Sequence, residues 1–145
     1  YQRKCLWCDE PFETTYPNKL YCTPECGYAG SLRLKREQWI AKYEQKAEPF
    51  SMTPGYNLWF RADKGFFLWK AKDGILGISH TSTNDIHFML GEMMRIAKEN
   101  NCSYLRTATV HNPASFMRLM GTHLNLEQSD WHNGRFYWFM EKEVI

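Results

Sequence analysis

Alternating apolar and polar residues in the middle of the chain predict three β-strands, at residues 56–61, 66–71 and 75–80. Turn signals separate these strands. Asp63-Lys64-Gly65 lies between the first two, and Asp73-Gly74, a dipeptide typical of tight hairpins, lies between the second and the third. Because such short connections join antiparallel neighbours, we expect a three-stranded antiparallel sheet.

The apolar period then changes to that of a helix, between residues 86 and 97. Thr83-Asn84-Asp85 supplies capping residues before this helix, and Asn100-Asn101 is a stop signal after it. Strand-like alternation returns at residues 102–110. The apolar positions of the predicted helix are Ile86, Met89, Leu90, Met93, Met94 and Ala97.

A second, shorter helix is predicted at residues 112–121, with Asn112 as its cap, Pro113 in its first turn and Gly121 at its end. Two more strands, at residues 122–128 and 135–141, flank a hairpin turn at residues 132–134. The strand–helix–strand crossover makes strands 75–80 and 102–110 parallel. The expected fold class is α+β: a mostly antiparallel sheet with one parallel crossover and two helices.

This order of elements, together with the segment from Asn112 to Gly121 ahead of a strand, resembles the C-terminal two-thirds of the GNAT family of acyl-CoA-dependent N-acyltransferases. The resemblance covers residues 56–145. It implies an acyltransferase-like domain, divergent or vestigial, with acyl-CoA as the cofactor to consider. The alternative is a non-catalytic module on the same scaffold, a phage structural component or a DNA- or protein-binding one.

Four of the five cysteines lie in the first 26 residues, as Cys5-x-x-Cys8 and Cys22-x-x-x-Cys26. Two such pairs can complete the tetrahedral sulfur shell of a structural Zn²⁺, and four protein sulfurs leave no position for a substrate. Two disulfides are the alternative. The lack of a signal peptide and the isolated Cys102 argue against a secreted, disulfide-bonded protein.

We expect a small hairpin between Cys8 and Cys22, and a helix from Thr23-Pro24 to about Gln45. A hairpin with one cysteine pair and a helix with the other form a treble-clef-type finger. The run from Tyr21 to Cys26 and the basic helix after it resemble short zinc fingers of bacteriophage proteins. The expected organisation is a finger at residues 1–46, a linker with two prolines at 47–55, and the GNAT-like domain at 56–145.

Candidate chemistry follows from the crossover, because ligands bind beyond the carboxyl ends of parallel strands at such points. The expected ends are Ser79-His80-Thr81 and Val110-His111-Asn112. His80 or His111 is the predicted base, with Ser79 and Asn112 as polar anchors. The backbone amides of Asn84, Asp85 and Ile86 would form an anion cradle. The structural alternative is one histidine in solvent at a strand end and the other in a loop.

The predicted coenzyme loop departs from the GNAT pattern, which resembles Arg/Gln-x-x-Gly-x-Gly/Ala. Residues 81–86 contain no glycine and no arginine, and Asp85 would place a negative charge near a diphosphate. The tyrosine that often serves as general acid in the last helix of the family is also missing. This composition favours the non-catalytic alternative, whereas the paired histidines favour the enzyme.

Charge and composition limit the partners. The net charge of +2 invites no polyanion by itself, so a nucleic-acid contact would depend on Arg33, Lys35 and Arg36 in the finger helix. A protein partner is the other candidate, and the aromatic residues of the finger are expected to be mostly buried. No apolar run approaches a membrane span, so we expect no membrane contact and a cytoplasmic location, the host cytoplasm or virion for a viral protein.

Overall fold

The computed structural model describes residues 1–109, 112–132 and 134–145. From residue 56 onward its helices and strands follow the predicted order, with one strand, Asp130–His132, that the sequence pattern does not predict. In chain order they are β1 (Gln2–Lys4), β2 (Pro11–Glu13), α1 (Pro24–Lys46), β3 (Asn57–Arg61), β4 (Gly65–Lys72), β5 (Ile75–Thr83), α2 (Ile86–Glu99), β6 (Tyr104–Thr109), α3 (Pro113–Met120), β7 (His123–Leu124), β8 (Asp130–His132) and β9 (Arg135–Glu143).

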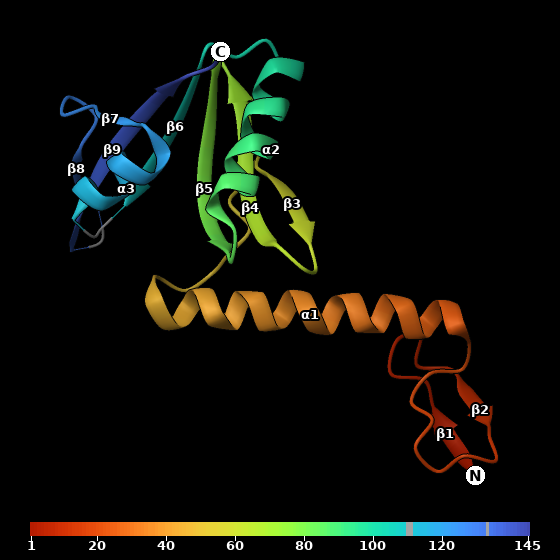
Figure 1. Ribbon diagram of the computed structural model, residues 1–145. Coiled ribbons are helices and arrows are strands. Elements are labelled where there is room, and N and C mark those ends of the chain that lie inside the picture. Colours follow the sequence, from red (N-terminus) through yellow and green to blue (C-terminus); the bar gives the residue numbers. More distant parts are fainter. Residues whose placement is uncertain (110–111, 133) are drawn as a thin grey trace.

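The main sheet has the order β3-β4-β5-β6-β9-β7, and β8 pairs with β9 (Figure 1). Strands β3, β4 and β5 are antiparallel neighbours, as expected. The crossover through α2 makes β5 and β6 parallel, and β9 returns antiparallel to β6. The predicted fold class, with one parallel crossover and two helices after the linker, is confirmed.

Two predicted strand boundaries are wrong. Strand β5 continues to Thr83, three residues beyond His80, because β4 pairs with it as far as Gly65↔Thr83. The predicted strand 122–128 shrinks to β7 because Asn125 begins a turn. The Asn125 backbone oxygen accepts from the Ser129 backbone amide at 3.2 Å, and its side-chain oxygen accepts from the Gln128 amide at 3.3 Å.

The main core lies between α2 and the sheet. The apolar side of α2 buries Met89, Met93 and Ala97, as their helical spacing predicts, and also Ile96. They pack against Phe67, Leu76, Ile78, Cys102 and Leu105. Within the described residues, no helix is long and apolar enough to cross a membrane.

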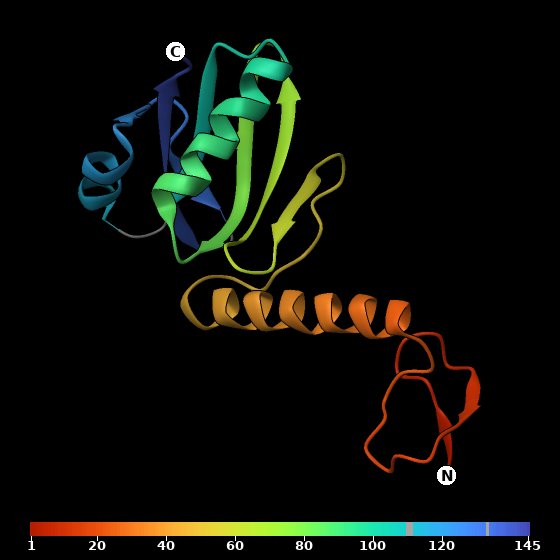
Figure 2. The same cartoon turned by 45° about the vertical axis from the view of Figure 1, so that its right-hand side comes forward.

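Residues 1–23, here called the cysteine segment, lie at the far end of α1 from the sheet (Figures 1 and 2). Strands β1 and β2 pair antiparallel on either side of Cys5 and Cys8. The hairpin is therefore not between Cys8 and Cys22 as predicted, because its first arm precedes Cys5. The expected cap is confirmed: the Thr23 hydroxyl accepts from the Cys26 amide at 3.2 Å, and Pro24 opens α1.

The C-terminal half of α1 runs across one end of the sheet (Figure 2). The Trp39 indole donates to the Ala62 carbonyl at 2.9 Å. The Tyr43 ring meets the buried Phe66 ring edge-on, with 5.9 Å between centroids. Phe50, in the predicted linker, meets Phe66 at 5.3 Å. Contacts thus cross the predicted boundaries at residues 46 and 56, and the domain division stays a prediction.

Candidate functional site

The sulfur atoms of Cys5, Cys8, Cys22 and Cys26 all lie within 4.8 Å of one another. Cys8 Sγ and Cys22 Sγ are 3.6 Å apart, and Cys22 Sγ and Cys26 Sγ are 3.7 Å apart. A disulfide requires about 2 Å. Four sulfurs bound tetrahedrally to Zn²⁺ at about 2.3 Å would stand roughly 3.8 Å apart. These four residues could therefore hold one metal ion, and they fit zinc.

Backbone turns aim the sulfurs at one point. The Asp9 amide donates to the Cys5 carbonyl at 3.0 Å, and Asp9 adopts a positive φ of 62° to close this turn. The Leu6 amide donates to the Leu20 carbonyl at 3.0 Å, which brings the two cysteine pairs together. Burial and the neighbouring thiols raise the pKa of Cys22 to about 12, so four thiolates would need a bound cation.

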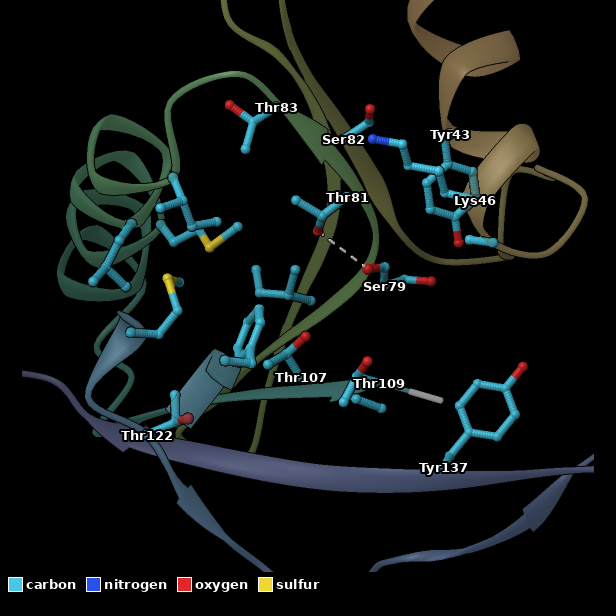
Figure 3. Close-up of a pocket in the computed structure, with 18 of the residues that line it drawn as sticks. Tyr43, Lys46, Ser79, Thr81, Ser82, Thr83, Thr107, Thr109, Thr122 and Tyr137 are labelled. Carbon is cyan, nitrogen blue, oxygen red and sulfur yellow. Dashed lines mark hydrogen bonds between the residues drawn. The ribbon is translucent and has the colours of Figure 1, made fainter. Parts of the chain in front are cut away.

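A second candidate site lies where β5 and β6 diverge. Their parallel pairing joins Ile75–Gly77 to Tyr104–Arg106, and beyond these residues a cavity of about 440 Å³ opens between the strands (Figure 3). Helix α2 contributes one wall of the cavity, and α1 lies at its mouth. Lining residues include Ser79, Thr81, Ser82, Thr83, Ile86, Leu90, Met93, Thr107, Ala108, Phe116, Met120 and Thr122.

A β-bulge in β5 decides which side chains face this cavity. Phe67 pairs with Thr81, but Trp69 pairs with Ile78, so two residues of β5 lie opposite Leu68 alone. Ser79 and Thr81 consequently both line the cavity, and the Thr81 hydroxyl donates to the Ser79 carbonyl at 3.3 Å (Figure 3). Across the cavity, the buried Thr122 hydroxyl has no hydrogen-bond partner within the described residues.

The bulge leaves His80 on the side of the sheet that faces α1. His80 is 8% exposed and is not among the residues that line the cavity. Its Nδ1 lies 2.5 Å from Tyr43 Oη and 3.4 Å from Glu48 Oε1. Burial lowers the pKa of His80, although Glu48 opposes this shift, so the imidazole is neutral at pH 7. His111, the other predicted base, lies outside the described residues.

Glu48 and two tyrosines bring titratable groups to the cavity mouth. Tyr43, Glu48 and Tyr137 all line the cavity, and the Tyr137 hydroxyl donates to Glu48 Oε2. This hydrogen bond, with burial, raises the pKa of Tyr137; burial and the Glu48 charge raise the pKa of Tyr43. Sequence reasoning missed all three residues, because α1, the linker and β9 contribute one each and no local motif joins them.

The predicted coenzyme residues divide into two groups. Ser79 and Ile86 line the cavity, whereas Asn84, Asp85 and Asn112 are not among its lining residues. The Asn84 side-chain amide donates to the Asp63 carbonyl at 3.1 Å.

Asp85 and Asn112 instead cap helices. Asp85 Oδ1 accepts from the Phe88 amide at 3.1 Å, and its Oδ2 lies 3.1 Å from Lys64 Nζ. The Phe88 amide and Lys64 together lower the pKa of Asp85. Asn112 accepts from the Ala114 amide at 2.9 Å. Of the amides in the predicted cradle, that of Asn84 donates to the Lys64 carbonyl at 3.3 Å and that of Asp85 to the Thr83 hydroxyl at 3.0 Å, so two of the three already have partners.

The predicted nucleic-acid residues do not share one side of α1. Arg33 donates to the Leu6 carbonyl at 3.0 Å and lies over the Trp7 ring, at 5.4 Å from its centroid, so it ties the cysteine segment to the helix. Arg36, three residues on, is on a similar side, whereas Lys35 points away from both. Contrary to expectation, several aromatic residues of residues 1–46 are exposed, including Tyr16 at 71% and Tyr28 at 70%.

Comparison with known proteins identifies the fold of this chain. No family model matches the sequence, and no curated protein matches it. A solved structure from Lactobacillus plantarum, described as an N-acetyltransferase, is similar at a TM-score of 0.56 and 12% identity, over 85% of this chain and 94% of that one. The structure of TofI in a ternary complex with an inhibitor and MTA is similar at a TM-score of 0.54 and 13% identity, over 81% of this chain and 85% of that one. Together with the topology, these similarities show that the chain has a GNAT-like fold.

Proposed function

We propose that the chain is an acyl-CoA-dependent N-acyltransferase of a divergent kind, with its donor in the cavity between β5 and β6. The observation that carries this proposal is the divergence of these two strands after three residue pairs. Beyond that point β5 offers backbone amides and carbonyls toward the cavity. The amide-containing arm of an acyl-CoA is an extended chain that could pair with such a strand edge.

The groups at the cavity mouth can carry out the transfer of an acyl group to an amine. An acceptor amine attacks the thioester carbonyl, the C–N bond forms, the C–S bond breaks, and the thiol leaves. Glu48 accepts the proton of the amine. Tyr137 donates a proton to the departing sulfur, and the protonated Glu48 then returns a proton to the Tyr137 oxygen through their hydrogen bond, so both groups regain their starting states. Ser79 and Thr122 offer hydroxyls to the acyl carbonyl, and His80 positions Tyr43 rather than touching the substrate.

Melting of the full chain with and without millimolar acetyl-CoA tests donor binding, because a ligand of the folded state raises Tm. We expect a rise for the natural chain and for Ala41→Trp, which adds the same bulk at an exposed position on α1 outside the cavity lining. Ala108→Trp fills the cavity and should abolish the rise. Equal rises for both variants would contradict the site.

Activity separates the roles of Glu48 and Tyr137 from donor binding. With acetyl-CoA and a panel of primary amines, Glu48→Gln and Tyr137→Phe should each lower kcat by about a hundredfold or more, the usual size of a lost acid or base. Both variants should keep the acetyl-CoA shift in Tm. Full activity in both would remove these residues from the chemistry.

A second candidate function is a non-catalytic binding scaffold. Asp85 favours it, because this carboxylate occupies the amide at the start of α2 where a coenzyme diphosphate would need to bind. For such a scaffold, acetyl-CoA leaves Tm unchanged even in Asp85→Asn. An acyltransferase with a merely weakened coenzyme site should instead gain affinity in Asp85→Asn.

We also propose that Cys5, Cys8, Cys22 and Cys26 hold a structural Zn²⁺, as the sulfur separations support. The resemblance of this segment to phage zinc fingers supports a bacteriophage setting, and with it the host cytoplasm or the virion as the location. Elemental analysis of purified protein should give one zinc per chain. A value near zero in protein prepared without chelators would contradict the metal site.

A further inference from the structure

One side of α1 carries three lysines in a row. Lys35, Lys42 and Lys46 are separated by seven and four residues, which places them on one side of the helix at axial spacings of about 10 and 6 Å. Lys42 and Lys46 line the cavity mouth, and Lys35 is exposed closer to the cysteine segment. Glu37 and Glu44 each follow a lysine by two residues, so both carboxylates lie nearly opposite the row.

Aromatic rings accompany this lysine row. Tyr28 lies seven residues before Lys35, on the same side of α1, and 70% of its surface is exposed. Trp39 lies between Lys35 and Lys42, and Lys42 Nζ is 5.0 Å from the centroid of its ring. The side of α1 that leads from the cysteine segment to the cavity therefore alternates between cationic and aromatic residues.

The β8–β9 hairpin carries a second surface beside the cavity mouth. Trp131 pairs with Phe136, so Trp131, Phe136 and Trp138 lie on one face of the hairpin, whereas Arg135 and Tyr137, which line the cavity, lie on the other. Trp131 is 66% exposed, and its ring lies 5.5 Å from that of Phe136, which lies 4.7 Å from that of Trp138. These three residues line a shallow, open hollow together with Arg135, and Arg135 also lines the cavity. Phe136 and Trp138 are half-buried, so Trp131 is the ring of this cluster that is open to a ligand.

We propose that these two surfaces form one track for a single-stranded nucleic acid, which runs along the lysine row of α1, past the cavity mouth to Arg135, and around the edge of the hairpin onto Trp131. Lys35, Lys42, Lys46 and Arg135 would contact phosphates, and the rings of Tyr28 and Trp131 would stack on bases. Unpaired bases fit best, because the faces of paired bases are covered within a duplex. An acidic peptide would satisfy the cations but leave the rings unused. This inference goes beyond the proposed acyl transfer and does not depend on it.

The test uses the full, zinc-loaded chain and a fluorescein-labelled 20-nucleotide oligothymidine, with binding followed by anisotropy across a NaCl series. We expect log Kd to rise with log salt, and Lys35→Ala to reduce that slope by roughly 0.7, the value for one phosphate contact on a single strand. Lys98→Ala is the matched control, because Lys98 is exposed at the end of α2 far from α1 (Figure 1) and should leave the slope unchanged.

Trp131→Ala should weaken binding about fivefold or more, because one base–aromatic stack is lost, and Trp131→Phe should restore part of the affinity. Four results would overturn the proposal: no binding at low salt, equal slopes for Lys35→Ala and Lys98→Ala, tighter binding of a duplex of the same length, or equal competition by a 20-residue polyglutamate. The acetyl-CoA shift in Tm, measured on the same variants, reports on the cavity alone and so separates failure of the track from failure of the acyltransferase.

Discussion

In the cysteine segment, Cys5 is the one buried residue among the described positions 1–23, whereas residues 56–145 bury Phe66, Phe67, Leu68, Leu76, Met89 and Met140 completely. The first region supplies three of the four clustered sulfurs, with Cys26 of α1 as the fourth, and has almost no apolar interior. The second has a sheet with a helix packed on it. Apolar burial stabilises the second region, whereas the first would depend on the proposed zinc ion, so the two regions should respond to different perturbations.

Removal of the proposed zinc ion should have the largest effect, and it should act on residues 1–23 alone. A four-sulfur zinc site supplies roughly 10 kcal/mol or more of folding free energy to a segment without a core. We expect Cys22→Ser, or a strong chelator, to unfold residues 1–23 and expose them to protease while the main thermal transition persists. Cys102→Ser is the control, since this buried cysteine lies in the main core and should leave zinc content unchanged. Loss of both regions together would contradict independent stabilisation.

The reverse experiment removes core volume. Phe67 is fully buried and stacks on Trp59 with 5.1 Å between ring centroids. Phe67→Ala should cost about 3–5 kcal/mol, because a cavity replaces a large ring. Chemical denaturation measures the loss, and zinc content measured alongside should stay at the natural level. A fall in zinc content would mean that the two regions fold as one unit.

Two helical glycines near the metal site form a matched pair. A Cβ at Gly30 would come within 2.3 Å of the Tyr21 ring, whereas a Cβ at Gly27 would lie 3.7 Å from it, at ordinary contact distance. Gly30→Ala should therefore displace Tyr21 and weaken zinc binding in a competition with a chromophoric chelator. Gly27→Ala should be neutral or stabilising by about 0.5–1 kcal/mol, since alanine is the better helix former. Equal effects would contradict the packing of Tyr21 on α1.

The smallest expected effect is a pH dependence confined to the sheet region. Because burial lowers the pKa of His80 in the folded state, the unfolded chain binds this proton more readily. Stability should thus fall as pH drops below about 6.5, the ordinary histidine pKa, and His80 should contribute nothing above it. His80→Gln should flatten this part of the urea-denaturation profile. An identical slope in His80→Gln would contradict the assignment.

Local patterns in the sequence predict most of the fold. The alternation at residues 56–80, the spacing of Met89 and Met93 in α2, and the Thr23 cap each depend on residues close in the chain. The four clustered cysteines could also be found from local spacing, because they all lie between residues 5 and 26. The cavity could not be predicted from local patterns. It forms because β5 and β6 stop pairing after Gly77↔Arg106, and the sequence of neither strand shows how many residues will pair.

The β5 bulge explains the main error at the site. If the side chains of β5 alternated without a bulge, His80 would face the cavity. The extra residue opposite Leu68 places His80 on the other side of the sheet, where it contacts Tyr43. The sequence could not identify Glu48 as a site residue for a related reason. A proline-containing segment without periodicity reads as a linker, and only the docking of α1 on the sheet brings this carboxylate to Tyr137.

Helix α1 also fixes the distance between the cysteine cluster and the cavity. It has 23 residues and so extends about 34 Å, with Cys26 of the cysteine cluster in its first turn and Lys46 at the cavity in its last. A single uninterrupted helix between these points acts as a spacer with a fixed rotational phase. A partner held by the cysteine segment would be presented to the cavity at one separation, and an insertion of one residue in α1 would turn it by about 100°.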